Sequence, residues 1–325
     1  MNGSLPPFHL LRARTVNEAI AASAAHSGSR FLAGGSDLLV NMRHGISRPD
    51  LLVDLSAIDE LAEIEADEQG IAIGAGVRIA SLARNEFVSR YAALAQAAVA
   101  VAGPGHRSLG TIGGNLCLDT RCIYYNQSEW WRKANNYCLK NGGDTCHVAP
   151  QGQRCHAAFT GDLAPALLVL GAEIEIAGAQ GRRRISLRHL YVEDGKAHLA
   201  LANDELIVRV RLPHPIRSAY AKIRTRAAID YPLAGVAVGL AMSGAVIDTL
   251  RVAVTGTNSR PFLLAGTETM TGRKLDDNVL QEIGRLVQKQ VQPMRTTLTS
   301  ANYRRLAAAA LAKRLIADLG ATNAD

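Results

Sequence analysis

Residues 32–37 read LAGGSD and residues 111–115 read TIGGN, and these two glycine-containing segments decide the interpretation of the chain. In each segment, paired glycines are followed by a polar side chain. Glycine lets the backbone approach an anion closely, and consecutive amide groups ahead of a helix stabilise negative charge. Each segment is therefore a candidate phosphate-binding loop.

Both segments also have an ordinary structural interpretation. Ser36 or Asp37 could cap the helix that follows the first segment, and the second segment could be a surface turn. Neither matches the GxGxxG or GxxxxGK[ST] pattern. The presence of both in one chain favours binding of a dinucleotide, which offers two phosphates. Asp162 is a third candidate, either as an acceptor for a ribose hydroxyl or as the cap of the segment that follows it.

Regular structure is expected on both sides of these segments. Thr15 and Glu18 have the spacing of a capping box, which predicts a helix over 15–27 that ends at Gly28. Up to residue 110, we expect strands at 30–33, 51–55 and 72–77, and helices at 38–44, 80–91 and 92–102. Beyond residue 162, we expect strands at 173–176, 205–212, 219–224, 233–241 and 246–254, and closing helices at 277–289 and 300–319.

Residues 116–156 differ from the rest of the chain, because they contain all five cysteines and lack apolar periodicity. A loop of this length in a compact domain needs a function or a cross-link to order it. Cys122, Cys138, Cys146 and Cys155 have the spacing C-x15-C-x7-C-x8-C, and Cys117 precedes them. Four thiolates suit an iron–sulfur cluster or structural zinc, and redox or structural thiols are a third alternative. A [4Fe–4S] cluster tolerates irregular spacing and would leave one cysteine spare, whereas zinc sites usually have two short knuckles.

The chain has 325 residues, a formal charge of +7 and an isoelectric point near 9.3. Its densest basic run, at 182–184 and 188, is read as a solvated turn, and without interleaved aromatic residues it does not favour nucleic-acid binding. Residues 1–7 lack the pattern of a secretory signal, and no apolar run has the length of a membrane span. We therefore expect a cytoplasmic protein that binds neither nucleic acid nor membrane.

Five segments together resemble the FAD-binding subunits of the xanthine dehydrogenase, or molybdenum hydroxylase, family. They are AGGSDL at 33–38, TIGGNL at 111–116, GDLAPA at 161–166, AKIR at 221–224 followed by Asp230, and SANYR at 300–304. The resemblance implies an α+β fold. In it, a two-subdomain FAD-binding domain of the vanillyl-alcohol oxidase (molybdopterin dehydrogenase) type precedes a C-terminal α/β domain.

The resemblance also implies the cofactor-binding residues and the domain limits. The FAD-binding domain would cover residues 1–215, with subdomains at 1–57 and 58–215, and the C-terminal domain would cover 216–325. The implied FAD-binding residues are Leu32, Ala33, Gly34, Gly35, Ser36, Asp37, Thr111, Gly113, Gly114, Asn115, Asp162, Lys222 and Arg224.

Most members of this family pass from the second glycine segment to the segment at Asp162 within a few residues, so 116–156 is an insert. It resembles the flavoprotein subunits of the 4-hydroxybenzoyl-CoA reductase type, which carry an additional [4Fe–4S] cluster. This resemblance implies Cys122, Cys138, Cys146 and Cys155 as ligands and leaves Cys117 free. It further implies reduced ferredoxin as the electron donor, a [2Fe–2S] subunit and a molybdenum-cofactor subunit as partners, and a hetero-oligomer of dimeric trimers.

Two other functions stay open on the sequence. One is the FAD subunit of an NAD-linked molybdenum hydroxylase whose insert binds zinc or is merely structural. The other is a basic module that binds nucleic acid. No Ser/His/Asp or paired-carboxylate arrangement indicates a complete active site on this chain.

Overall fold

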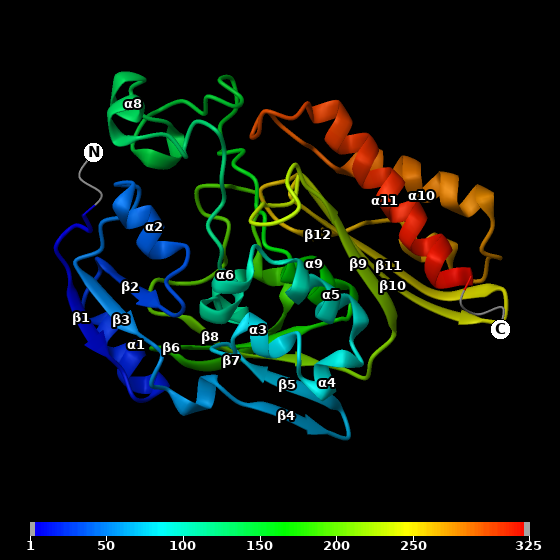
Figure 1. Cartoon of the computed structure of the whole chain (residues 1–325), viewed down its shortest axis with the longest axis horizontal. Helices are drawn as coiled ribbons and strands as arrows, with labels where there is room; N and C mark the ends of the chain where they lie inside the picture. Colours follow the sequence, from blue (N-terminus) through cyan, green and yellow to red (C-terminus); the bar gives the residue numbers. More distant parts are fainter. Residues whose placement is uncertain (1–3, 322–325) are drawn as a thin grey trace.

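The computed structural model describes residues 4–321, and the chain folds around three β-sheets (Figure 1). The fold is α+β: two sheets with their helices lie before residue 213, and a third sheet with two long helices forms the C-terminal part. Within the described residues, no helix combines the length and the apolar character needed to cross a membrane.

The first sheet is small and parallel, with the strand order β1-β3-β2. Thr15 accepts a hydrogen bond from the amide of Glu18 and caps the first helix, which confirms the predicted cap. The first strand of the chain was not predicted, because its side chains are mostly exposed and its pattern is weak. The elements of this subdomain are β1 (His9–Arg12), α1 (Val16–Ala24), β2 (Ser29–Leu32), α2 (Leu38–Arg43) and β3 (Leu51–Asp54).

The second sheet is antiparallel, with the order β4-β5-β8-β6-β7. The basic run at 182–184 lies on its edge strand β7, where the arginines pair with glutamates of neighbouring segments. The strands are β4 (Ile64–Asp67), β5 (Gly70–Gly74), β6 (Glu173–Gly178), β7 (Gly181–Ser186) and β8 (Leu206–Leu212). The helices of this subdomain are α3 (Ile79–Leu82), α4 (Glu86–Ser89), α5 (Ala92–Ala100), α6 (Pro104–Leu109), α7 (Ile112–Leu116) and α9 (Leu163–Val169).

The predicted continuous helix over 80–91 is wrong, because the chain forms two short helices there. Asn85 interrupts it, and its side chain accepts hydrogen bonds from the amides of Phe87 and Val88. An asparagine that caps a new helix offers the backbone an alternative to continuing the old one.

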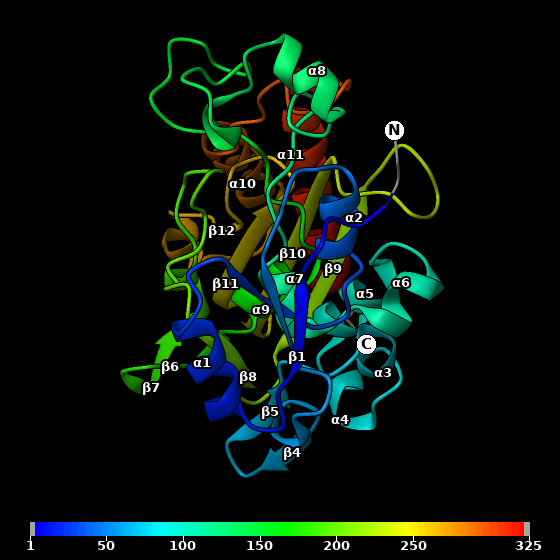
Figure 2. The same cartoon turned by 90° about the vertical axis from the view of Figure 1, so that its left-hand side faces the viewer.

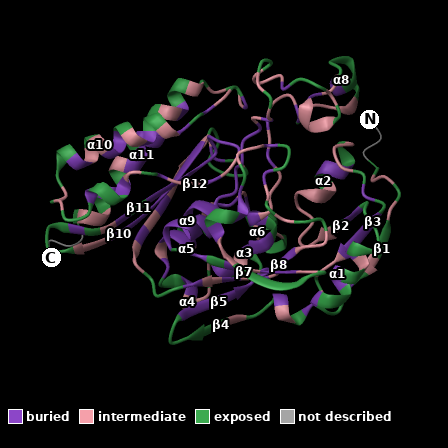
Figure 3. Ribbon diagram, turned by 180° about the vertical axis from the view of Figure 1, so that it is seen from behind, coloured by how far each residue is buried: buried purple, intermediate pink, exposed green. Residues whose placement is uncertain are grey.

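The third sheet forms the C-terminal domain, with the antiparallel order β12-β11-β10-β9. Figure 3 shows its central strands buried and the outer faces of its two long helices exposed. The elements are β9 (Arg217–Ile223), β10 (Ala234–Ser243), β11 (Val246–Thr255), β12 (Phe262–Leu263), α10 (Asp277–Gln290) and α11 (Ala301–Ala321).

Arg304, within the SANYR segment, ties α11 to this domain. Its side chain is completely buried, and its guanidinium donates to the carbonyl oxygens of Leu233 and Met294, each at 2.9 Å. The segment therefore has a structural role here.

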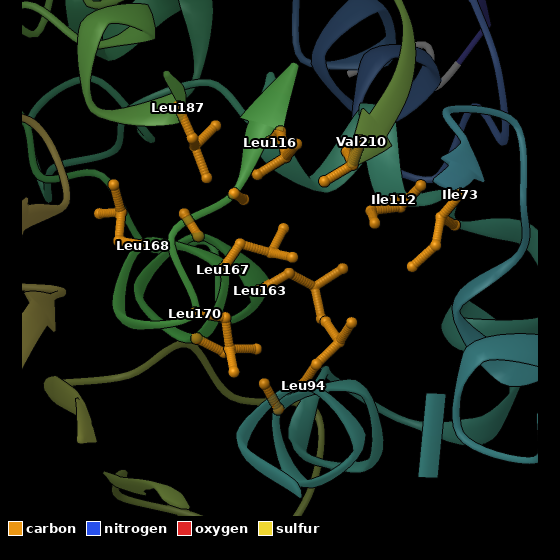
Figure 4. Packing of buried hydrophobic residues seen from close by; sticks show 14 of the residues in the cluster. Ile73, Leu94, Ile112, Leu116, Leu163, Leu167, Leu168, Leu170, Leu187 and Val210 are labelled. Carbon is orange, nitrogen blue, oxygen red and sulfur yellow. The ribbon is translucent and has the colours of Figure 1, made fainter. Parts of the chain in front are cut away.

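The largest apolar core lies between the second sheet and its helices, with α9 at its centre (Figure 4). Leu163 and Leu167 of α9 point toward Ile112 of α7 and Leu94 of α5. Because α7 and α9 share this core, the second glycine segment and the start of α9 are held together.

The insert rises from this core and lies at one end of the molecule, beyond α2 (Figures 1 and 2). Its regular structure is one helix, α8 (Glu129–Ala134), and one turn of 3₁₀ helix at Leu139–Asn141. The rest of residues 117–158 is irregular, as predicted from the missing apolar period.

Candidate functional site

The first glycine segment joins β2 to α2. It packs against the backbone of Leu109 and Gly110, which lead into the second glycine segment. A Cβ atom added at Gly34 would lie 1.9 Å from the carbonyl oxygen of Leu109, so only glycine allows this contact. Gly35 has φ +69°, a conformation that favours glycine. The amides of Gly35, Ser36 and Asp37 donate no hydrogen bond to any described residue. These three amides, at the start of a helix, are available to an anion.

The second glycine segment is the helix α7, capped by the Thr111 hydroxyl. Its amides at 112, 113 and 115 donate to backbone oxygens, and that of Gly114 donates to Thr111 Oγ1. This segment therefore differs from the predicted row of free backbone donors. It positions the first segment and the start of α9 instead.

Asp162 occupies the N-cap position of α9, but its side chain forms no capping hydrogen bond, so its predicted role as a side-chain cap is wrong. Its Oδ1 atom accepts from the Tyr220 hydroxyl at 2.6 Å and lies 2.9 Å from Lys222 Nζ. Burial raises the pKa of Asp162, while Lys222 and Arg224 act to lower it. Asn115 Oδ1 accepts from the Leu163 amide at 3.1 Å, which brings the second segment to this group. The structure thus gathers Asn115, Asp162, Lys222 and Arg224.

Two residues absent from the sequence prediction connect these groups. Arg121 donates from Nη2 to Asp37 Oδ1 at 2.5 Å, and Asp37 in turn accepts from Asn41. Tyr231 lies within electrostatic reach of both Asp37 and Asp162, and desolvation of its hydroxyl together with these carboxylates raises its pKa, although 48% of the residue is exposed. Tyr231 follows Asp230 of the fourth family segment, which was a usable signal. Arg121 carries no local signal, because its partner is 84 positions away.

The four predicted metal ligands line a single small cavity in the insert. Each of these cysteines is buried, and none forms a disulfide. Cys117 does not line this cavity and packs against the main core. The cavity is lined by Cys122, Cys138, Cys146 and Cys155 together with Tyr124, Tyr125, Leu139, Lys140, His147 and Val148.

Hydrogen bonding and burial change the acidity of these thiols. A hydrogen bond from the Cys155 thiol lowers the pKa of Cys146 to about 5, and the same bond raises that of Cys155. Burial raises the pKa of Cys122, and it raises that of Cys117 to about 12. Across residues 4–321, no group of three or more His, Cys, Asp or Glu side chains has the geometry for binding one metal ion.

Lys140 joins the cysteine-lined part of the insert to its first residues and to Gly195. Its ammonium donates to Asp119 Oδ1 at 2.6 Å, to the Gly195 carbonyl at 2.9 Å and to both oxygens of Thr120. It also lies 4.7 Å from the centre of the Tyr125 ring. Burial raises the pKa of Asp119 and Lys140 lowers it, with a net downward shift. A fully engaged lysine therefore anchors the wall of the cysteine cavity.

Two known protein domains match most of the chain. Residues 6–215 match the FAD binding domain in molybdopterin dehydrogenase, and residues 218–319 match the CO dehydrogenase flavoprotein C-terminal domain. This chain belongs to the FAD-binding subunits of the xanthine and CO dehydrogenase, or molybdenum hydroxylase, family. The resemblance seen in the sequence is confirmed at this level. No comparison supports the more specific relation to 4-hydroxybenzoyl-CoA reductase.

The relatives align with most of the chain. The aldehyde oxidoreductase FAD-binding subunit of Escherichia coli is 34% identical over 80% of this chain and 85% of its own length. The glyceraldehyde dehydrogenase medium chain of Sulfolobus acidocaldarius is 25% identical over 92% and 94%. A carbon monoxide dehydrogenase structure from Hydrogenophaga pseudoflava, which lacks the Mo-pyranopterin moiety, superposes with a TM-score of 0.81 at 22% identity, covering 98% of this chain and 99% of that one. This likeness shows the shared fold.

The described residues fit an FAD. The three free amides before α2 suit a phosphate, and the buried charges beyond them suit the polar parts of a nucleotide. FAD binding therefore follows from the family and agrees with the geometry.

Proposed function

We propose that this chain is the FAD- and [4Fe–4S]-binding electron-transfer subunit of a molybdenum enzyme of the 4-hydroxybenzoyl-CoA reductase type. In this proposal, reduced ferredoxin donates electrons. A [2Fe–2S] subunit and a molybdenum-cofactor subunit receive them, in a cytoplasmic hetero-oligomer of dimeric trimers. The reaction at molybdenum would remove the phenolic hydroxyl from a thioester-activated ring on another chain.

The four buried thiols around one cavity are the observation that carries the proposal. An irregular segment of this length needs an added source of folding free energy, and metal ligation by thiolates supplies it. The thiols surround a space, as ligands of a polynuclear cluster do. The separate position of Cys117 supports Cys122, Cys138, Cys146 and Cys155 as the ligand set.

The flavin half of the proposal assigns roles to the chain's own residues. The segment from Leu32 to Asp37 would bind the pyrophosphate of FAD through its free amides, next to Thr111, Gly113, Gly114 and Asn115. Asp162 would hold Lys222 toward the nucleotide, with Arg224 adding positive charge. FAD supplies the exchange between one- and two-electron carriers.

The partners are inferred from the relatives and from charge. The Escherichia coli relative is named as a subunit and the Sulfolobus relative as a medium chain, which supports assembly with other chains. A formal charge of +7 suits an acidic electron carrier, because complementary charge raises the encounter rate.

The names of the relatives include xanthine and carbon monoxide dehydrogenases, which favours a molybdenum hydroxylase as the alternative. In that alternative the chain is the FAD subunit of an NAD-linked enzyme, with zinc in the insert or with an insert that is merely structural.

Metal analysis of the purified full-length chain with its co-purifying partners separates the two. The proposal predicts about four iron and four sulfide per chain beyond those of a [2Fe–2S] partner, with a new EPR signal after dithionite. It also predicts flavin reduction by reduced ferredoxin and none by NADH. About one zinc per chain and fast reduction by NADH would establish the alternative.

A further inference from the structure

Arg121 closes the base of the insert. Its amide donates to the Ala158 carbonyl at 2.9 Å, and the Ala158 amide donates back at 2.8 Å, so the two ends of the insert are bridged. Cys122 follows directly in sequence. The backbone of Arg121 therefore has its position set by the same segment that holds the cysteine cavity.

The side chain of Arg121 points away from the insert and contacts Asp37 of the first glycine segment. Its ion pair with Asp37 is largely shielded from water, with the two side chains 11% and 27% exposed. Asp37 also accepts from Asn41 of α2 at 3.1 Å. Burial raises the pKa of Asp37, and Arg121 acts against this shift, with a smaller contribution from Asn41. One guanidinium thus fixes the start of α2, where the free amides lie.

The Nε atom of Arg121 lies beside this ion pair as a second hydrogen-bond donor. This atom is buried and has no hydrogen-bond acceptor among the described residues. A buried donor without an acceptor is costly, so an oxygen acceptor placed here would complement it. Arg132, Arg209 and Arg211 have the same unpartnered Nε atom, so the ion pair with Asp37 is what links Arg121 to the first glycine segment.

We propose that Arg121 is a positioning residue that couples the two sites, so that a filled thiolate site strengthens FAD binding. This inference rests on the proposed function. An empty thiolate site leaves residues 122–157 without the order that ligation supplies, and the backbone of Arg121 is then less fixed. The pair with Asp37 weakens, and with it the loop that binds the pyrophosphate. Coupling of this kind is reciprocal, so FAD would also retain the metal centre.

A mutant cycle on the full-length chain tests the coupling. FAD dissociation constants are measured by titrating deflavinated protein, with iron content determined in parallel. In the native background, Cys122→Ser should raise the FAD dissociation constant about fivefold or more, the lower range of measured couplings. In an Arg121→Met background, the same change should raise it less than about twofold, since the connection is already broken.

Arg154 offers a matched control, because it precedes Cys155 as Arg121 precedes Cys122. It lies next to Ser259 and Glu193, and no hydrogen bond or ion pair joins it to the first loop. Arg154→Met should therefore leave the coupling intact. An equal effect of Cys122→Ser in the native and Arg121→Met backgrounds would overturn the inference, as would loss of coupling in Arg154→Met.

Asp37→Asn provides a second route if Arg121→Met fails to fold. It keeps the acceptor and removes the charge, and it should reduce the coupling in the same way. A native chain without iron overturns the proposed cluster. A native chain with full iron and no coupling overturns only the role of Arg121.

Discussion

The ammonium of Lys222 lies 2.9 Å from the Oδ1 atom of Asp162, and the two side chains are only 3% and 5% exposed. Lys222 belongs to β9 of the C-terminal domain, whereas Asp162 begins α9 in the core of the FAD-binding domain. Tyr220, also on β9, donates to the same carboxylate. The candidate flavin site is therefore built across the two domains.

Lys222→Met should destabilise the protein strongly, because it leaves the buried Asp162 carboxylate without its cation. Removing one partner of a buried pair costs about 3–5 kcal/mol of unfolding free energy. Denaturant unfolding, followed by circular dichroism, measures this loss. The double variant Lys222→Met with Asp162→Asn should recover much of it, since no charge is then left buried. A double variant as unstable as Lys222→Met alone would show that the charge is not the cause.

Gly34→Ala should abolish FAD binding, because its Cβ atom would lie 1.9 Å from the carbonyl oxygen of Leu109. The backbone at Leu109, just before the second segment, would have to move, and the two segments would separate. Gly105→Ala is the control, since, apart from the neighbouring backbone, no atom of residues 4–321 lies within 4 Å of a Cβ atom there. The flavin content of the two purified variants is compared. Equal flavin in both would contradict the role of the contact at Gly34.

Cys→Ser changes at 122, 138, 146 and 155 should each remove the absorbance and EPR signal of the proposed cluster. Serine is a poor replacement for a thiolate ligand of iron. FAD should stay bound when it is supplied in excess. Cys117→Ser is the control, because Cys117 lies outside the cavity. Loss of the cluster in Cys117→Ser with retention in Cys122→Ser would reverse the ligand assignment.

The stability of the protein should fall as the pH decreases from 6.5 toward 4, through His198. Burial and then the charge of Lys140 lower the pKa of His198 to about 4, from an ordinary value of 6.5. Between these values the unfolded chain binds more protons than the folded one, so its stability rises with pH there and is lost on acidification. The two pKa values correspond to roughly 3 kcal/mol.

His198→Gln tests this assignment, because it removes the titrating ring and keeps a donor for the Leu118 carbonyl, to which the ring is bonded at 3.0 Å. Its free energy of unfolding should change less between pH 7 and pH 4.5 than that of the native chain. An identical pH dependence in the two proteins would assign the acid sensitivity to other groups.

The features that the sequence determined are those carried by neighbouring residues. Paired glycines between a strand and a helix predicted the first loop, and the concentration of cysteines between 117 and 155 set the insert apart. The two terminal helices and most of the strands after residue 162 follow their apolar periods, within one or two residues of the prediction. Turn chemistry and apolar periodicity depend on neighbouring residues, so they can be read from the sequence without knowledge of the fold.

Only the tertiary structure decided which partners the buried polar groups have. Asp162 was expected to cap a helix or to accept from a ribose, and the structure shows that Tyr220 and Lys222, 58 and 60 positions away, hold its carboxylate. Its contact with a ribose stays a prediction. The amide of Gly114, which was expected to face a phosphate, donates to the hydroxyl of Thr111. Arg121 meets Asp37 across 84 positions, and Lys140 meets Asp119 beneath the cysteine cavity.

Neighbouring residues in the sequence do not predict these pairings. A buried charge is costly unless it is paired, and its partner comes close only when the chain has folded. The sequence therefore determined which loops and thiols this protein offers. The packing of three sheets decided which of their donors remain free for a flavin, and which residue connects the flavin loop to the insert.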